Sequence, residues 1–174
     1  MLKGLRSMDV EDCCAALEEA MDLLTSGLAD RSLLQPLIAL TASPDEQVRR
    51  DSSWCIGKLA MLKLGDPRSI GALLSLAVDK DPEVRENVAW ALGELAGLNI
   101  GDTMSIEILN IMLTDPQKEV RGLAAWALGR MADKMRVTSP SSVPLLKFML
   151  QDESEYLRRG AKWSLERIER LRVI

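Results

Sequence analysis

The feature that most constrains this sequence is a motif that recurs four times at nearly constant spacing. In each copy an aliphatic residue is followed by an arginine and, five residues later, by a tryptophan. The three sets, in chain order, are Val48, Val84, Val120 and Leu157; Arg49, Arg85, Arg121 and Arg158; and Trp54, Trp90, Trp126 and Trp163. The spacings within each set are 36, 36 and 37 residues. A period in this range, seen four times, predicts a solenoid of stacked supersecondary units.

Each unit is predicted to contain two helices joined by a tight turn. Apolar residues make up 47% of the 174 residues, yet only six are aromatic, so the core must consist mainly of aliphatic residues and favours helices. Cap signals predict where the helices begin. The second helices are expected to start at Ser43-Pro44, Asp81-Pro82, Asp115-Pro116 and Asp152, and the first helices at Asp66-Pro67, Asp102-Thr103 and Ser139-Pro140. Pro36 predicts a kink or a late start in the first copy.

The stretch "GDPRSIGALLSLAVDKDPEVRENVAWALGELA" resembles the HEAT repeats, and specifically the short subtype named after phycobilisome lyases. The resemblance covers residues 30 to about 171. It implies an all-α fold, an α-solenoid of four HEAT-like helix pairs over about 30–65, 66–101, 102–138 and 139–174. It also implies that the second helices line the concave side of the array. Because such repeats serve as scaffolds in unrelated systems, the resemblance does not fix an activity.

Residues 1–29 precede the repeats and do not share their register. Between Asp9 and Ser26 the apolar residues fall on one helical stripe, and Gly27 is a stop signal. The stripe contains Val10, Cys13, Cys14, Leu17, Met21 and Leu24. We therefore expect an N-terminal capping helix that covers the first repeat, in one continuous domain with residues 30–174, because the terminal units of solenoids need a polar outer face. Its cysteines are expected to face the core.

The tryptophans lie off the predicted core stripe of the second helices. On a helical wheel the aliphatic positions of the second copy, among them Val84, Val88 and Leu92, cluster within about 100°, whereas Trp90 points about 240° away from the first of them. Given the HEAT architecture, four such indoles would form a ladder along the concave face, which is a candidate binding groove. Alternatively, each indole leans sideways into the seam between repeats, and an intermediate position with one edge buried would satisfy both interpretations. Gly57, Gly93 and Gly129 are expected to leave the concave surface beside each indole free of protruding side chains.

Arginines surround the last tryptophan. On the fourth second helix Arg159, Arg167 and Arg170 share a strip with Trp163, which predicts an acidic partner at the C-terminal end of the groove. A solvated, arginine-rich terminal helix is the alternative. The arginine that follows each aliphatic residue lies beside the core near the turn, so we interpret this series as structural, with Asp45 or Asp81 and the last carbonyls of the first helices as partners.

Several classes of function find no support. The chain has no histidine, which removes the usual general base and zinc ligand, and it has no glycine-rich phosphate-binding motif. We expect no catalytic residues, no metal and no cofactor. The formal net charge is −4, with 10 basic and 18 acidic residues up to Asn110 and 12 and 8 thereafter. Such a charge makes nucleic acid an improbable partner.

The cysteines and the hydropathy pattern predict where the protein resides. Cys13, Cys14 and Cys55 give no disulfide framework, and neither a leader peptide nor an apolar run long enough for a membrane span is recognisable. We therefore expect a cytoplasmic protein without membrane contact, either a monomer or a subunit of a larger complex.

Three hypotheses for function follow. The first is a non-catalytic protein–protein interaction scaffold that binds another protein or a peptide segment on the concave face. Its candidate residues are Trp54, Trp90, Trp126, Trp163, Arg159, Arg167 and Arg170. The second, which the name of the subtype suggests, is a bilin or tetrapyrrole lyase-like protein or chaperone. The third is a HEAT-like nucleic-acid binder whose tryptophans stack on bases.

Overall fold

The structure is a computed structural model that describes residues 3–171. Within this range every regular element is helical. The α-helices are α1 (Val10–Ser26), α2 (Leu34–Leu40), α3 (Glu46–Met61), α4 (Ser69–Leu76), α5 (Pro82–Ala96), α6 (Thr103–Met112), α7 (Lys118–Arg130), α8 (Ser142–Met149) and α9 (Glu155–Leu171). Short 3-10 turns, η1 (Gly4–Arg6) and η2 (Arg31–Leu33), precede α1 and α2, and a π-helical turn, η3 (Met131–Met135), follows α7.

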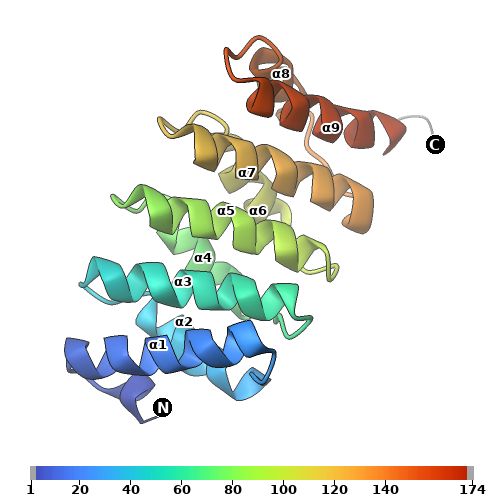
Figure 1. Cartoon of the computed structure of the whole chain (residues 1–174). Coiled ribbons are helices and arrows are strands. Elements are labelled where there is room, and N and C mark those ends of the chain that lie inside the picture. The colour runs from blue at the N-terminus through green and yellow to red at the C-terminus, as the bar shows by residue number, and fades with distance from the viewer. Residues whose placement is uncertain (1–2, 172–174) are drawn as a thin grey trace.

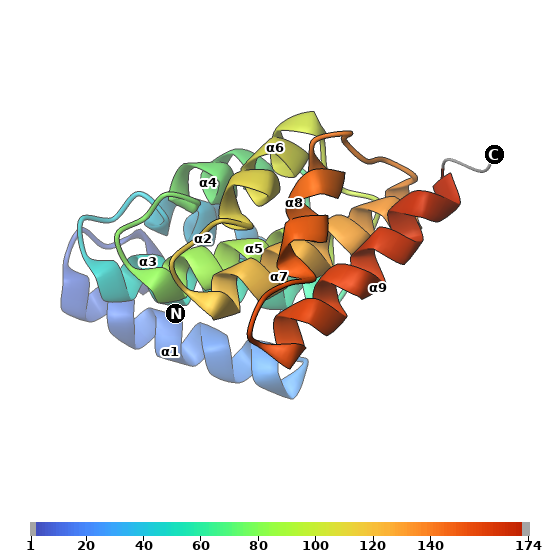
Figure 2. The ribbon, with the colours of Figure 1, turned by 90° about the horizontal axis from the view of Figure 1, so that it is seen from above.

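The helices form two layers, as the solenoid prediction requires. The odd-numbered helices α1 to α9 lie side by side in one layer, and the shorter helices α2, α4, α6 and α8 lie behind them (Figures 1 and 2). The pairs stack in chain order, so that α3, α5 and α7 each contact the preceding and the following odd-numbered helix, and α9 contacts α7. None of the described helices combines the length and the apolar character that crossing a bilayer requires.

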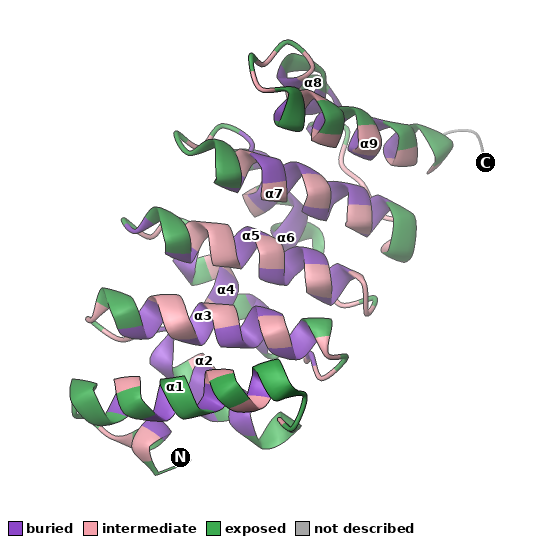
Figure 3. Ribbon diagram, viewed as in Figure 1, coloured by how far each residue is buried: buried purple, intermediate pink, exposed green. Residues whose placement is uncertain are grey.

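The core lies between the two layers (Figure 3). The wheel prediction for the second copy is confirmed, because Val84, Val88, Leu92 and Leu95 are each at most 1% exposed. On the shorter helices α2, α4, α6 and α8, Leu37, Leu73, Leu109 and Leu146 are fully buried in the same core. Burying a side chain of this size stabilises a fold by roughly 1.5–3 kcal/mol, so this aliphatic seam is what holds consecutive pairs together.

The predicted N-terminal helix is present as α1. The Asp9 carboxylate accepts from the backbone N–H groups of Glu11 and Asp12, and the helix ends at Gly27, whose φ of 74° is in the left-handed region that favours glycine. α1 packs against α3. Cys13 is buried and Cys14 is half-buried against the core. The solvent-facing side of α1 is mostly polar, with Glu11, Asp12, Glu18 and Asp22 exposed.

Several predicted helix starts are wrong by two or three residues. Only Asp81 and Asp102 cap the helices that they were expected to cap. α3 is capped by Asp45 rather than Ser43, and α7, α9, α4 and α8 begin at Lys118, Glu155, Ser69 and Ser142. The reason is that Ser43, Asp115 and Asp152 accept from the backbone N–H two residues on, which forms a turn before the helix. Pro36 lies in the first turn of α2, which begins late as expected.

The arginine series is structural, as predicted, but its partners differ from the predicted ones. The carboxylates are not those of Asp45 and Asp81, and the carbonyls belong to the turn rather than to the end of the first helix. Arg85 Nε lies 2.7 Å from Asp115 Oδ2 in the next repeat, and its Nη1 donates to the carbonyls of Asp79 and Lys80. Arg49 and Arg121 pair in the same way with Asp79 and Asp152. Each guanidinium therefore joins the turn before its own helix to the turn before the next one. Within the described range, Arg158 makes only two side-chain hydrogen bonds, to the carbonyls of Asp152 and Glu153.

Candidate functional site

Each of the last three tryptophans packs one edge of its indole on a glycine of the preceding repeat. A Cβ atom added to Gly57 would lie 2.6 Å from Cε3 and Cζ3 of Trp90, which is too close for any side chain. Gly93 meets Trp126 and Gly129 meets Trp163 in the same way. The glycines are therefore needed beneath the indole of the following repeat, whereas the sequence interpretation placed them beside the indole of their own helix.

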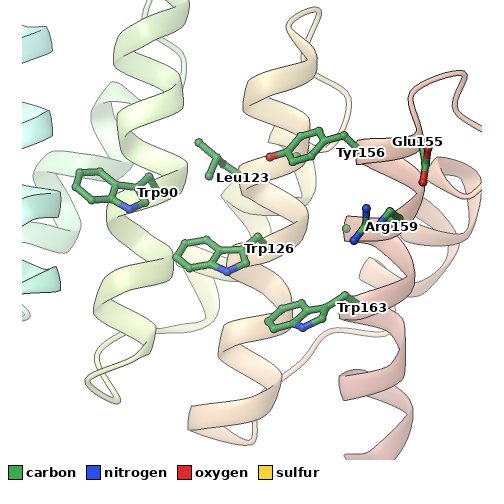
Figure 4. A pocket seen from close by; sticks show the side chains of 9 residues that line it. Trp90, Leu123, Trp126, Glu155, Tyr156, Arg159 and Trp163 are labelled. Atoms are coloured by element: carbon green, nitrogen blue, oxygen red, sulfur yellow. The ribbon is translucent and has the colours of Figure 1, made fainter.

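Part of each indole remains exposed on the face that the odd-numbered helices form. All four tryptophans are partly exposed, so the intermediate of the two sequence interpretations describes them. Among the described residues no indole nitrogen donates a hydrogen bond, and none of these nitrogens is fully buried. In Figure 4 the nitrogens of Trp90, Trp126 and Trp163 lie on the same side of their rings. The ladder thus presents unpaired N–H donors to solvent.

A hollow of about 760 Å³ crosses α5, α7 and α9 on this face (Figure 4). Its lining, which we call the aromatic groove, consists of Trp90, Gly122, Leu123, Trp126, Glu155, Tyr156, Arg159, Gly160 and Trp163. The volume falls within the range of about 300–1,000 Å³ that is usual for ligand pockets. Such a surface is suited to stacking and hydrogen-bond donation.

Tyr156 is a groove residue that the sequence analysis missed. It precedes the aliphatic residue of the fourth copy, a position that is polar in the other copies, and its ring packs on Gly122 of α7. The signal that could have found it is Gly122, which stands where Arg50 and Glu86 stand in the first two copies. Tyr156 is still 57% exposed, so it adds an aromatic wall beside Leu123.

A second hollow, of about 390 Å³, adjoins the aromatic groove and shares Leu123 and Tyr156 with it. We call it the acidic side pocket; the rest of its lining is Glu86, Lys118, Glu119 and Ser154. Burial raises the pKa of the half-buried Glu86, and the neighbouring carboxylates of Glu119 and Glu83 raise it further. Burial and the carboxylates of Glu86 and Glu119 also raise the pKa of Tyr156.

The predicted arginines of α9 lie in three different environments. Arg159 is exposed and lines the aromatic groove. Arg167 stacks on Trp163, with its Cζ 3.5 Å from the ring centre, and its Nη1 donates to the Trp163 carbonyl at 2.9 Å. Arg170 is exposed and does not line the groove.

Trp54 lies at the N-terminal end of the ladder, outside the hollow. Its ring centre is 6.4 Å from that of Trp90, and Lys58 Nζ lies 5.8 Å from its ring centre. Arg130 covers Trp126 similarly at 5.0 Å. A cation four residues after the tryptophan thus covers one side of three of the four indoles. Of the predicted site residues, Trp90, Trp126, Trp163 and Arg159 meet in one groove.

The described residues bring no three Cys, Asp or Glu side chains together in a way that could hold a metal ion. The three thiols are free: Cys13 and Cys55 are buried, and burial raises the pKa of all three. The groove itself offers aromatic faces, N–H donors and a few charged side chains.

The two-layered stack of helix pairs defines a repeat protein of the α-solenoid class. A family profile described as HEAT repeats matches residues 34–109 and 106–174. The chain belongs to the HEAT-repeat family. A search of curated proteins found no match.

Solved structures share the fold at low sequence identity. A designed armadillo repeat protein in complex with the peptide (KR)4 has a TM-score of 0.74 and 20% identity, over 95% of this chain and 79% of that one. Computationally designed armadillo repeat proteins for modular peptide recognition have a TM-score of 0.69 and 21% identity, over 95% and 79%. The complex of CpcE and CpcF of phycocyanin lyase from Nostoc sp. PCC7120 has a TM-score of 0.74 and 17% identity, over 98% and 64%. At these identities the likeness shows the fold alone.

Proposed function

We propose that this protein is a non-catalytic scaffold that binds a segment of a partner protein in the aromatic groove. The observation that supports it most strongly is the row of half-exposed indoles of Trp90, Trp126 and Trp163, whose N–H groups have no acceptor in the described chain. Aromatic residues that are anchored on one edge and open on the other are the usual hot spots of protein interfaces. That a designed relative in fold binds a peptide is in keeping with this use of the surface.

The proposal includes a cytoplasmic location, which the three free thiols favour. It also includes an acidic group of the partner near Arg159. Arg167 and Arg170 have different roles in the proposed binding site. Arg167 supports Trp163 from one side, and Arg170 adds positive charge beyond the end of the groove.

The test is capture of partners from the native lysate with the wild type and with a Trp90→Ala/Trp126→Ala double variant. We expect the recovery of the groove partner to fall at least about tenfold in the variant, because truncating two aromatic hot spots typically costs more than about 2 kcal/mol. The matched control is Ile111→Ala/Phe148→Ala, which removes two apolar side chains that are 60% and 80% exposed on α6 and α8, in the other layer. The control is expected to retain the partner.

Circular dichroism of each variant must show the helical content of the wild type before its recovery is compared. The proposal is wrong if the folded double variant recovers the same proteins in the same amounts. It is also wrong if the control variant loses them instead, because the partner would then bind the outer layer.

Tetrapyrrole binding is the second candidate, since an aromatic groove with Arg159 at its wall could stack a ring system and pair with a propionate. The likeness to the phycocyanin lyase complex concerns the fold alone. An absorbance shift of bilin or haem that depends on Trp126 and Arg159 would favour this candidate over the scaffold. Nucleic acid remains disfavoured, because Glu86 and Glu119 beside the groove repel phosphate.

A further inference from the structure

The side chains around the aromatic groove narrow the chemistry of the partner, provided that the proposed function holds. We propose that the occupant is an extended peptide segment of about six residues whose main-chain carbonyls accept from the indole N–H groups. It carries a lysine or arginine that reaches the acidic side pocket and a carboxylate that reaches Arg159.

The unpaired indole donors favour an extended segment over a helix. A helix satisfies its own carbonyls except in its last turn, so its sides offer no acceptors to a row of N–H groups. An extended segment without a neighbouring strand leaves its carbonyls free along its whole length. The donors of Trp90, Trp126 and Trp163 come from three successive helices and lie on the same side of their rings, so one segment that crosses these helices can meet all three.

The spacing of the helices sets the length of the segment. Neighbouring helices pack roughly 8–10 Å apart, so the distance from α5 to α9 is on the order of 16–20 Å. An extended chain rises about 3.3 Å per residue, and about six residues cover that distance. At the N-terminal end the rings of Trp54 and Trp90 are 6.4 Å apart, close to the rise of about 6.6 Å for two residues of such a chain.

The acidic side pocket contains a carboxylate that lacks a counter-charge. Glu83 pairs with Arg50 at 3.3 Å, and Glu119 has Lys118 at 3.8 Å, but no ion pair or hydrogen bond reaches Glu86 within the described chain. Glu86 is half-buried, and its raised pKa reflects burial next to like charges. A lysine or arginine side chain that enters beside Tyr156 would relieve this repulsion.

Arg159 supplies the opposite charge on α9. Its neighbour Arg158 donates to two backbone carbonyls and Arg167 donates to the Trp163 carbonyl, whereas no ion pair or hydrogen bond of Arg159 exists within the described chain. Glu155, one turn earlier, makes no ion pair with it at 4 Å or less. A segment with opposite charges at its two ends would thus be held in one direction, because the reverse orientation places like charges together.

The probes are two fluorescently labelled, end-blocked hexapeptides of leucine and threonine, with lysine at one end and glutamate at the other, in the two possible orders. A third probe has the composition of the first but is locked as a helix by a hydrocarbon staple. Fluorescence anisotropy gives the affinity of each probe. We expect one order to bind at least about tenfold more tightly than the other and the stapled helix to bind no better than the weaker order.

Two variants identify the groups responsible. Glu86→Lys/Arg159→Glu exchanges the two charges and is expected to invert the ranking of the two hexapeptides, whereas Glu107→Gln, an exposed carboxylate on α6, leaves the ranking unchanged. Trp126→Phe keeps an aromatic ring over Gly93 but removes one N–H donor, and it is expected to weaken the better hexapeptide about threefold to tenfold. Circular dichroism verifies that each variant is folded.

Tighter binding of the stapled helix, or a ranking that survives the charge exchange in a folded variant, overturns this inference. The proposed function is refuted by a different result, namely that the folded Trp90→Ala/Trp126→Ala variant recovers the lysate partner as well as the wild type does. A partner that the double tryptophan variant loses but Glu86→Lys/Arg159→Glu retains in full leaves the scaffold function intact and refutes the charge pattern of the proposed segment.

Discussion

Replacing Gly93 by alanine is expected to lower the free energy of unfolding by about 2 kcal/mol, although alanine favours a helix over glycine by about 1 kcal/mol. The added methyl group would overlap the six-membered ring of Trp126, with 2.6 Å to Cε3. Because Arg130 covers one side of that indole, the ring can move only outward into the groove or together with α7, and either movement loses its packing on α5. Urea unfolding followed by circular dichroism measures the effect.

The matched control is Gly71→Ala in α4. A Cβ atom at Gly71 would meet nothing within 4 Å, so alanine there contributes only its better helix propensity. The control is expected to raise stability by up to about 1 kcal/mol. If the two alanine variants change stability in the same direction, the contact between glycine and indole does not determine how the repeats stack.

Replacing Arg85 by methionine, which keeps most of the aliphatic length, is expected to cost about 3 kcal/mol. The side chains of Arg85 and Asp115 are only 14% and 8% exposed, and loss of the guanidinium would leave the buried carboxylate without its ion-pair partner. The matched control is Arg158→Met, at the same position two repeats later, where the guanidinium bonds only to backbone carbonyls among residues 3–171. The control is expected to cost about 1 kcal/mol.

The arginine series also makes stability depend on pH in a definite direction. Burial alone would raise the pKa values of Asp79 and Asp115, but the hydrogen bonds from Arg49, Arg85 and backbone N–H groups outweigh it and lower them. Because these pKa values are lower in the folded state, the stabilisation is present above about pH 4 and is lost as the pH falls through the folded-state values. Arg85→Met should weaken this acid sensitivity, and an unchanged pH profile would contradict the proposed role of the pair.

The sequence predicts the solenoid, the core and the presence of α1 because these depend on period and helical face. Val84 and Leu92 are buried because they lie on one face of their helix, and the helical spacing that puts them there is visible in the sequence. The helix starts are less predictable, because an aspartate such as Asp115 can cap a helix or form the turn before it. The same carboxylate also accepts from Arg85, 30 residues earlier in the sequence, and the local sequence does not reveal that contact.

The relation of the tryptophans to neighbouring repeats could not be read from a single helix. A helical wheel gives the direction of Trp126 around α7 but not the position of α5, so it cannot place the indole on Gly93. Tyr156 is missed for the same reason, since its neighbour Gly122 belongs to another repeat. In the fourth copy Glu166 occupies the position of the glycines. It is exposed, and within the described residues no indole of a following repeat packs on it.

The measurement that tests the central claim most directly is the solvent accessibility of the four indole N–H groups in the free protein, resolved as separate ¹H–¹⁵N signals. A soluble paramagnetic agent is expected to attenuate the signals of Trp90, Trp126 and Trp163 strongly, while backbone amides of core residues such as Ala89 and Ala125 are unaffected. Indole signals as protected as those core amides would mean that the rings are sealed between repeats and that the aromatic groove does not exist.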